Sequence, residues 1–364
     1  MMKKIGIITH YNVHNHGAQL QLYALCAQLK QFGIDAKALQ YKKNYDFLTL
    51  GIENKYSISV RSIPIYIKYL LTKGIKRTIY NFNKKNKLDN FRKEKALEGE
   101  YYSKAEDLDF VVIGSDEIFS LEPGLNPCFW GMGVPCKKVV SYAASCGPTT
   151  NEFIEKHFAE EFVEAGVKRL GKISVRDENS YNIISRYTDR EISIVCDPVL
   201  LYDFNLERKE NEVRFGKNKY CIVYSYDERM NDTETVKAIK VFAKKRNSKV
   251  YSVGYYHKWC DKNIQADPLE LFSWFENADY IFTDTFHGTV LSIVCNTEFF
   301  AKISKNQNKL GFLLQEYGLE SRKIASFLEC EVLSEQPINF NVLNDKIKAI
   351  REKSLKFLKD ALEI

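Results

Sequence analysis

The sequence lacks the usual signals of a membrane protein, a secreted protein and a zinc-binding module. No run reaches the roughly 18 apolar residues that a bilayer span needs, and Lys68 interrupts the best candidate, residues 63–71. Lys3 and Lys4 precede a short apolar run, but no small-residue cleavage site follows it, so we expect no secretory signal. The nine cysteines are scattered and form no C-x-x-C pair. We therefore expect reduced thiols, a cytoplasmic location and no zinc module.

The motifs of several common chemistries are also missing. The chain has no G-x-G-x-x-G, no Walker lysine motif and no G-x-S-x-G elbow. His14 and His16 lie two residues apart, but no third metal ligand is recognisable near them. We expect neither a bound metal nor a cofactor.

What is present is an ordinary globular composition with one uneven feature. The 364 residues are 45% apolar and 27% charged, which predicts two domains with normal cores. The net charge of +6 comes from 53 basic and 47 acidic residues. Residues 42–95 hold 14 basic and 4 acidic side chains, so this stretch carries +10 and the rest carries −4. That distribution argues against a nucleic-acid partner and leaves open a local contact with an anionic membrane surface.

Apolar strands and amphipathic helices alternate along the chain, which predicts an α/β fold with parallel sheets. We expect a first domain over 1–204 with a basic helical excursion at about 42–106, and a second over 218–340. A final helix at 341–364 is long enough to pack back on the first domain. The expected strands are 4–9, 36–41, 110–113, 138–143, 173–175, 192–195, 220–224, 249–253, 280–282 and 299–303. The expected helices are 17–32, 233–246, 268–278, 289–295, 309–317 and 341–362.

Polar residues gather where these strands end, which is where open parallel sheets bind ligands. The bland explanation, that strands end in polar loops, remains open for each of them. The residues concerned are His14 to Gly17, Gly114 to Glu117, Ser145, Arg176 and Asp177, Asp197, Tyr226 and Asp227, and Asp284 to Thr289.

The sharpest local signal is the segment DTFHGT at 284–289. Gly288 allows a tight turn or a close ligand approach, Thr289 is a candidate helix cap, and His287 stands where free N–H groups favour an anion. Lys302, Lys305 and Lys309 follow and could complete the anion site. The alternative is a capped helix with a structural histidine.

Two further residues have both a functional and a structural interpretation. Arg176 is a fork-shaped donor suited to carboxylate or phosphate, or else a partner of Asp177 or Glu178. Asp116 is a candidate acid or base, or else caps the next turn.

Taken in order, these segments resemble the polysaccharide pyruvyl transferase family over most of the chain. The resemblance rests on KIGIITHYNVHNHGAQLQLYAL, DFVVIGSDEIF, VVSYAAS, ISVRDENS, VCDPVLL and ADYIFTDTFHGTVLSIVCN. It implies two Rossmann-like domains facing across a cleft, as in GT-B glycosyltransferases. It also implies transfer of a pyruvyl group from phosphoenolpyruvate to two hydroxyls of a sugar, giving a cyclic ketal in bacterial-type surface polysaccharide synthesis.

The resemblance also suggests roles for individual residues. Arg176 and His287 match the family's donor ligands, and Thr285 stands where the family often has an arginine. The family's Gly-Ser-Asp-Gln-x-Trp pattern is altered here at Glu117 and Phe119. We assign the donor to Arg176, His287, Gly288, Thr289, Lys305 and Lys309, and the acceptor to Asn15, His16, Gly17, Gln19, Ser115 and Glu117. Asp116, Asp284 and His287 are the catalytic candidates.

Two other functions remain open on the sequence. Thr285 leaves room for a GT-B-like glycosyltransferase that uses a nucleotide-sugar donor. The basic stretch leaves room for a binding module without catalysis. For the first function the expected partners are phosphoenolpyruvate and a sugar or lipid-linked glycan, with a peripheral contact to the inner face of an anionic membrane.

Overall fold

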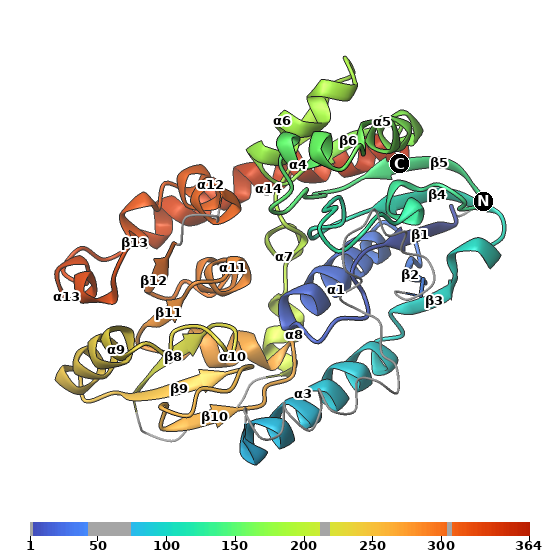
Figure 1. Ribbon diagram of the computed structural model, residues 1–364. Coiled ribbons are helices and arrows are strands. Elements are labelled where there is room, and N and C mark those ends of the chain that lie inside the picture. The colour runs from blue at the N-terminus through green and yellow to red at the C-terminus, as the bar shows by residue number, and fades with distance from the viewer. Residues whose placement is uncertain (1–2, 43–73, 212–218, 304–307) are drawn as a thin grey trace. The chain divides into compact units, whose positions relative to one another are not determined.

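The computed structural model describes residues 3–42, 74–211, 219–303 and 308–364, which form two compact units (Figure 1). Among the described residues, unit 1 comprises 3–42, 92–202 and 349–364. Unit 2 comprises 74–91, 203–211, 219–303 and 308–348. The chain passes from one to the other at Tyr202 and Asp203, just before the predicted boundary at 205–217.

Unit 1 is built on a five-stranded parallel sheet in the order β3-β2-β1-β4-β5. All four residues of β1 are buried, as expected for the central strand of a sheet covered on both faces. A separate parallel pair, β6 and β7, is linked to this sheet by a single bridge between Val175 and Ala144, which follows β5. The strands are β1 (Ile5–Ile8), β2 (Lys37–Gln40), β3 (Glu98–Tyr101), β4 (Leu108–Ile113), β5 (Cys136–Ser141), β6 (Ile173–Val175) and β7 (Ile192–Ile194).

The first helix of unit 1 begins at a side-chain cap. Asn15 Oδ1 accepts a hydrogen bond from the Gly17 N–H at 2.8 Å, and Gly33, with φ +80°, follows the helix end. The helices of unit 1 are α1 (His16–Gln31), α4 (Asn151–Lys156), α5 (Glu160–Arg169), α6 (Glu178–Ile184) and α7 (Pro198–Leu201).

Unit 2 is built on a six-stranded parallel sheet in the order β10-β9-β8-β11-β12-β13. Counted along the chain, this is the 3-2-1-4-5-6 order of a doubly wound Rossmann sheet, in which the strand order reverses between β8 and β11. The strands are β8 (Tyr220–Tyr224), β9 (Lys249–Val253), β10 (Lys262–Ile264), β11 (Ile281–Thr283), β12 (Phe299–Lys302) and β13 (Lys323–Ile324).

Aromatic side chains fill part of the core of unit 2, with Phe242, Phe282 and Phe300 in mutual contact. Two helices are shared between the units: α3 up to Phe91 and α14 up to Lys348 belong to unit 2, and their remainders to unit 1. The helices are α3 (Ile75–Glu94), α8 (Asn205–Glu210), α9 (Thr233–Lys245), α10 (Glu270–Glu276), α11 (Phe286–Val294), α12 (Asn308–Tyr317), α13 (Cys330–Leu333) and α14 (Phe340–Leu362).

The α/β fold class with two Rossmann-like units is confirmed, and each of the ten expected strand ranges overlaps a strand. One expected element boundary is wrong: the helix predicted from Thr289 begins at Phe286, because Thr285 and not Thr289 is its cap. Of the excursion expected at 42–106 in the first domain, residues 43–73 lie outside the described residues; residues 74–91 group with unit 2 and residues 92–106 with unit 1. None of the described helices combines the length and the apolar character that a bilayer crossing requires.

Candidate functional site

Four of the residues assigned to the acceptor lie at the end of the loop after β1 and in the first turn of α1. Asn15 caps α1, and His16, its first residue, is buried. Gln19 Nε2 donates to the carbonyl oxygens of Tyr11 at 2.8 Å and Val13 at 2.9 Å. Asn15 and Gln19 therefore shape this loop, and any acceptor contact adds to that structural role.

The loop after β4, the neighbour of β1, holds Asp116 in an unusual backbone conformation. Asp116 has φ +67°, in the left-handed region that non-glycine residues adopt rarely, and its carbonyl accepts from the Ser145 N–H at 2.9 Å. Ser115 is buried, and its carbonyl accepts from Thr9 Oγ1 at 3.1 Å. A strained residue held in this way at a strand end is a common feature of functional sites.

Arg176, directly after β6, is buried beside two carboxylates. Its Nη1 donates to Asp197 Oδ2 at 2.8 Å, and its Nη2 lies 3.9 Å from Asp116 Oδ1. Burial lowers the pKa of Arg176, but the carboxylates of Asp197, Asp116 and Asp177 outweigh it and raise that pKa above its ordinary value. The side chain is therefore a fixed positive charge.

Asp177, one of the two expected alternative partners of Arg176, contributes to the raised pKa of that side chain and also makes hydrogen bonds of its own. Asp177 caps α6, accepting at Oδ1 from the Ser180 N–H at 2.8 Å, and accepts at Oδ2 from Ser145 Oγ at 2.6 Å. Asp197 accepts a hydrogen bond from Arg176 and in turn accepts from Gln21 Nε2. The sequence therefore located both strand ends but not the pairing between them.

In unit 2 the segment after β11 forms the start of α11. Thr285 Oγ1 accepts from the Gly288 N–H at 3.0 Å, while Thr289 Oγ1 donates back to the Thr285 carbonyl at 3.2 Å. His287 lies in the first turn of this helix with 8% of its surface exposed. The first turn presents backbone N–H groups that favour an anion.

Gly288 is required by packing within this turn. A Cβ atom at this position would lie 2.2 Å from Thr283 Oγ1 and 2.8 Å from Thr285 Oγ1. The absence of a side chain at Gly288 therefore allows its backbone to pack against Thr283 of the preceding strand.

The loops after β8 and β11 meet where the strand order reverses. Asp284 Oδ1 accepts from Ser225 Oγ at 2.6 Å, and Arg229 Nη1 lies 3.4 Å from Asp284 Oδ2. The Arg229 side chain is 48% exposed, so part of its guanidinium faces solvent. Arg229 is the functional candidate that sequence reasoning missed, although Tyr226 and Asp227 had marked its loop.

The three lysines expected near this turn have different surroundings. Lys302 Nζ donates to Thr235 Oγ1 at 3.2 Å, on α9. Lys309 Nζ lies 5.9 Å from the ring centroid of Phe286, the first residue of α11. Lys305 lies outside the described residues.

The structure thus groups the candidates within each unit. Unit 1 brings Arg176 close to Asp116. Unit 2 places Asp284 to Thr289 in one turn with Arg229 beside it. Among the described residues, no three His, Cys, Asp or Glu side chains are arranged to hold a metal ion.

Several solved structures are similar to this chain in fold. One is a putative UDP-N-acetylglucosamine 2-epimerase from Listeria monocytogenes, at 9% identity and TM-score 0.49, covering 98% of this chain and 91% of that one. Another is the glycosyltransferase SnogD from Streptomyces nogalater, at 11% identity and TM-score 0.42, covering 97% and 95%. No curated protein matches the chain in sequence.

The family comparison is more direct. The model of the family described as polysaccharide pyruvyl transferase matches residues 15–305, which include every described residue of the two candidate groups except Lys309. Because that match covers well over half of the sequence, the chain belongs to the polysaccharide pyruvyl transferase family.

Proposed function

We propose that this enzyme transfers a pyruvyl group from phosphoenolpyruvate to two hydroxyls of a sugar and forms a cyclic ketal. The observation that carries the proposal is the turn at the start of α11, where His287 and the first N–H groups follow Asp284, the carboxylate that pairs with the cationic Arg229. Phosphoenolpyruvate carries a phosphate and a carboxylate, so its site needs several cationic or N–H donors. We retain Arg176 and His287 as donor ligands.

The family often has an arginine at the position of Thr285. Thr285 carries no charge, and its hydroxyl caps α11. We propose that Arg229 supplies it from the β8 loop. Its guanidinium is fixed on one side by Asp284 and keeps donors exposed on the other. Lys309 and Lys305 remain candidates for the same anion.

The reaction needs one acid and one base that act in turn. A proton is delivered to C3 of the enol, the first sugar hydroxyl bonds to C2 and releases its proton, and inorganic phosphate leaves with the electrons of its C–O bond. The second hydroxyl then bonds to C2 and releases its proton, which closes the ketal. Asp284, held by Ser225 and Arg229, is our candidate base; Asp116 and His287 remain candidates for the acid.

The acceptor is proposed to lie against the loops of unit 1. Asn15, His16, Gly17 and Gln19 form the start of α1, and Ser115 and Glu117 follow β4. These loops come from adjacent strands of the parallel sheet, at the edge where such sheets bind ligands.

The direct test is incubation of the purified chain with phosphoenolpyruvate and a panel of glycolipid and oligosaccharide acceptors. We expect phosphate release with a ketal on the product, detected by mass spectrometry. Arg229→Ala, Arg176→Ala and His287→Ala should each raise the KM for phosphoenolpyruvate by about 10- to 100-fold, as expected for a lost charge-assisted hydrogen bond.

Arg208→Ala is the matched control, because Arg208 is a partly exposed arginine of unit 2 that is paired with Glu276. It should leave the KM unchanged. Silence across a broad acceptor panel would contradict the proposed reaction. An unchanged KM in Arg229→Ala would contradict the role of Arg229 alone.

A glycosyltransferase with a nucleotide-sugar donor is the second candidate, favoured by the cap at Thr285 in place of a cation. Thermal shifts with UDP- or GDP-sugars, in the absence of any shift with phosphoenolpyruvate, would select it.

A further inference from the structure

Helix α3 packs on unit 2 through one well-defined face. Tyr80, Lys84 and Leu88 are buried at successive fourth positions. Tyr80 Oη donates to the Ile264 carbonyl at 2.7 Å, and Lys84 Nζ lies 3.9 Å from the ring centroid of Tyr255. This face contacts β10 and the loop after β9.

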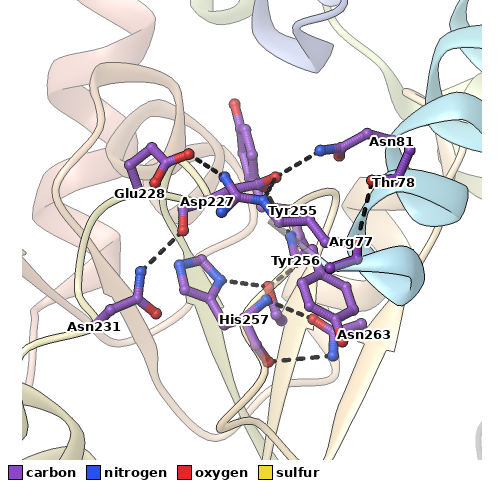
Figure 2. A network of polar contacts seen from close by, with 12 residues as sticks. Arg77, Thr78, Asn81, Asp227, Glu228, Asn231, Tyr255, Tyr256, His257 and Asn263 are labelled. Carbon is purple, nitrogen blue, oxygen red and sulfur yellow. Dashed lines mark hydrogen bonds and ion pairs between the residues drawn. The ribbon is translucent and has the colours of Figure 1, made fainter. Parts of the chain in front are cut away.

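A polar network fixes the rotation of α3 about its own axis (Figure 2). Asp227 Oδ2 accepts from Arg77 Nε at 2.9 Å and from Asn81 Nδ2 at 2.8 Å, while its Oδ1 accepts from the Tyr256 N–H at 3.0 Å. Burial raises the pKa of Asp227, but these three donors lower it below its ordinary value, so the carboxylate stays charged. The helix cannot turn without breaking these bonds.

The opposite face of α3 exposes large apolar side chains. Ile75, Ile79 and Phe82 are 71%, 56% and 62% exposed. Their spacing of four and three residues places them side by side on one stripe of the helix. Because the inner face is fixed by Asp227, this stripe cannot rotate into the core, and an apolar surface of this kind indicates an interaction site.

The surroundings of the stripe are strongly basic. Helix α3 contains seven Lys and Arg residues and two Asp and Glu residues, within the stretch 42–95 that carries +10. At 100° per residue, exposed Lys76 and Lys85 fall on opposite flanks of the stripe. Apolar side chains between lysines match the surface of an anionic bilayer.

We propose that the outer face of α3, defined by Ile75, Ile79 and Phe82 with Lys76 and Lys85 beside them, docks on a membrane surface that contains anionic lipids. The three apolar side chains enter the boundary between headgroups and acyl chains, and the lysines lie against the headgroups. A second copy is a poorer occupant, because a twofold contact would bring two faces of the same positive charge together. The inference stands apart from the proposed reaction.

The test is co-sedimentation of the full chain with phosphatidylcholine vesicles, with and without phosphatidylglycerol. We expect binding only to the anionic vesicles, weakened by salt. Ile79→Asn with Phe82→Asn should lower the partition coefficient by about tenfold or more. Lys76→Gln with Lys85→Gln should lower it by about tenfold and remove part of the salt dependence.

The matched control is Leu328→Asn with Val332→Asn, which changes two exposed apolar residues elsewhere in unit 2 that are 64% and 65% exposed. These variants should bind as the parent does. Equal binding by the Ile79 and Phe82 variant would overturn the proposal. The proposal would also be overturned if the parent did not bind vesicles but formed a dimer, and this variant did not form that dimer. Turnover of a water-soluble acceptor should be unchanged throughout, so failure of docking is distinct from failure of the reaction.

Discussion

At the scale of single residues, Lys84 is a lysine kept in the interior of unit 2. Burial lowers the pKa of its ammonium from 10.5 to about 8, and the charge of Asp227 offsets only part of that effect. Its ammonium lies over the Tyr255 ring, which partly replaces the lost hydration. The charged form is therefore costly in the folded protein at neutral pH.

Replacing Lys84 should make this cost measurable as a pH dependence. Between pH 8 and 10.5 the unfolded chain binds the proton more tightly than the folded one, so the stability of the parent rises with pH in that window. In that window the free energy of unfolding of the parent should rise, relative to that of Lys84→Met, by about 1.4 kcal/mol per pH unit. Urea unfolding at pH 7.5 and 9.5 measures it.

Lys85→Met, at an exposed position of the same helix, is the control for the loss of one lysine. If the difference in free energy of unfolding between Lys84→Met and the parent stays constant from pH 7.5 to 9.5, burial does not disfavour the charge of Lys84.

At the scale of elements, Arg77 of α3 makes two ion pairs that differ in how deeply the partner is buried. Asp227 and Arg77 have side chains only 11% and 13% exposed, whereas Glu228, the other partner of Arg77, is 59% exposed. A buried pair whose partner is removed leaves an uncompensated charge, while an exposed pair contributes little.

Asp227→Ala should therefore release α3. We expect a loss of about 3 kcal/mol in the free energy of unfolding and faster amide exchange over residues 75–91. Glu228→Gln should change either quantity little, by about 0.5 kcal/mol or less. Equal effects of the two substitutions would show that Arg77 alone, and not its buried partner, holds the helix.

The elements also show what could be predicted from the sequence. The ten strands that were expected carry apolar runs, while the three that were missed, β3, β10 and β13, lie at sheet edges. Edge strands need no apolar run and often carry charge, as EGEY and KNI do. Helix α3 was expected only as part of a basic helical excursion. Its buried face includes Lys84 and its exposed face includes Ile79 and Phe82, which reverses the usual pattern.

For the candidate site, the sequence predicted which loops carry the polar residues but not which side chains form ion pairs. Asp197 and Arg229 both follow predicted strands, yet nothing local indicates that they reach Arg176 and Asp284. Those pairs depend on which strands become neighbours, and β8 and β11 are separated by more than fifty residues of chain.

At the scale of the whole molecule, α14 is the last element and ends in unit 1. Arg351 Nε donates to the Leu200 carbonyl at 2.8 Å, the Cys196 N–H donates to Ser354 Oγ at 3.0 Å, and Leu358 is fully buried. The final residues are thus part of the core of unit 1, although their helix begins in unit 2.

Leu358→Ala should lower the stability of unit 1 by about 2–5 kcal/mol, the usual cost of a large-to-small change in a core. Val342→Ala, on the same helix but 63% exposed, should cost about 0.5 kcal/mol or less. Limited proteolysis with identification of the cleavage sites measures which unit opens. Early cleavage in 203–348 rather than in unit 1 would contradict this assignment.

The division of unit 1 into three stretches of chain has a consequence for how the protein is made. Its sheet comes from residues near the start of the sequence, but its last piece, 349–364, leaves the ribosome only after all of unit 2. Chains fold from the N-terminus as they emerge, so unit 2 has all of its residues available first. Unit 1 therefore lacks its closing helix until unit 2 has been translated, and during that interval it depends most on chaperones.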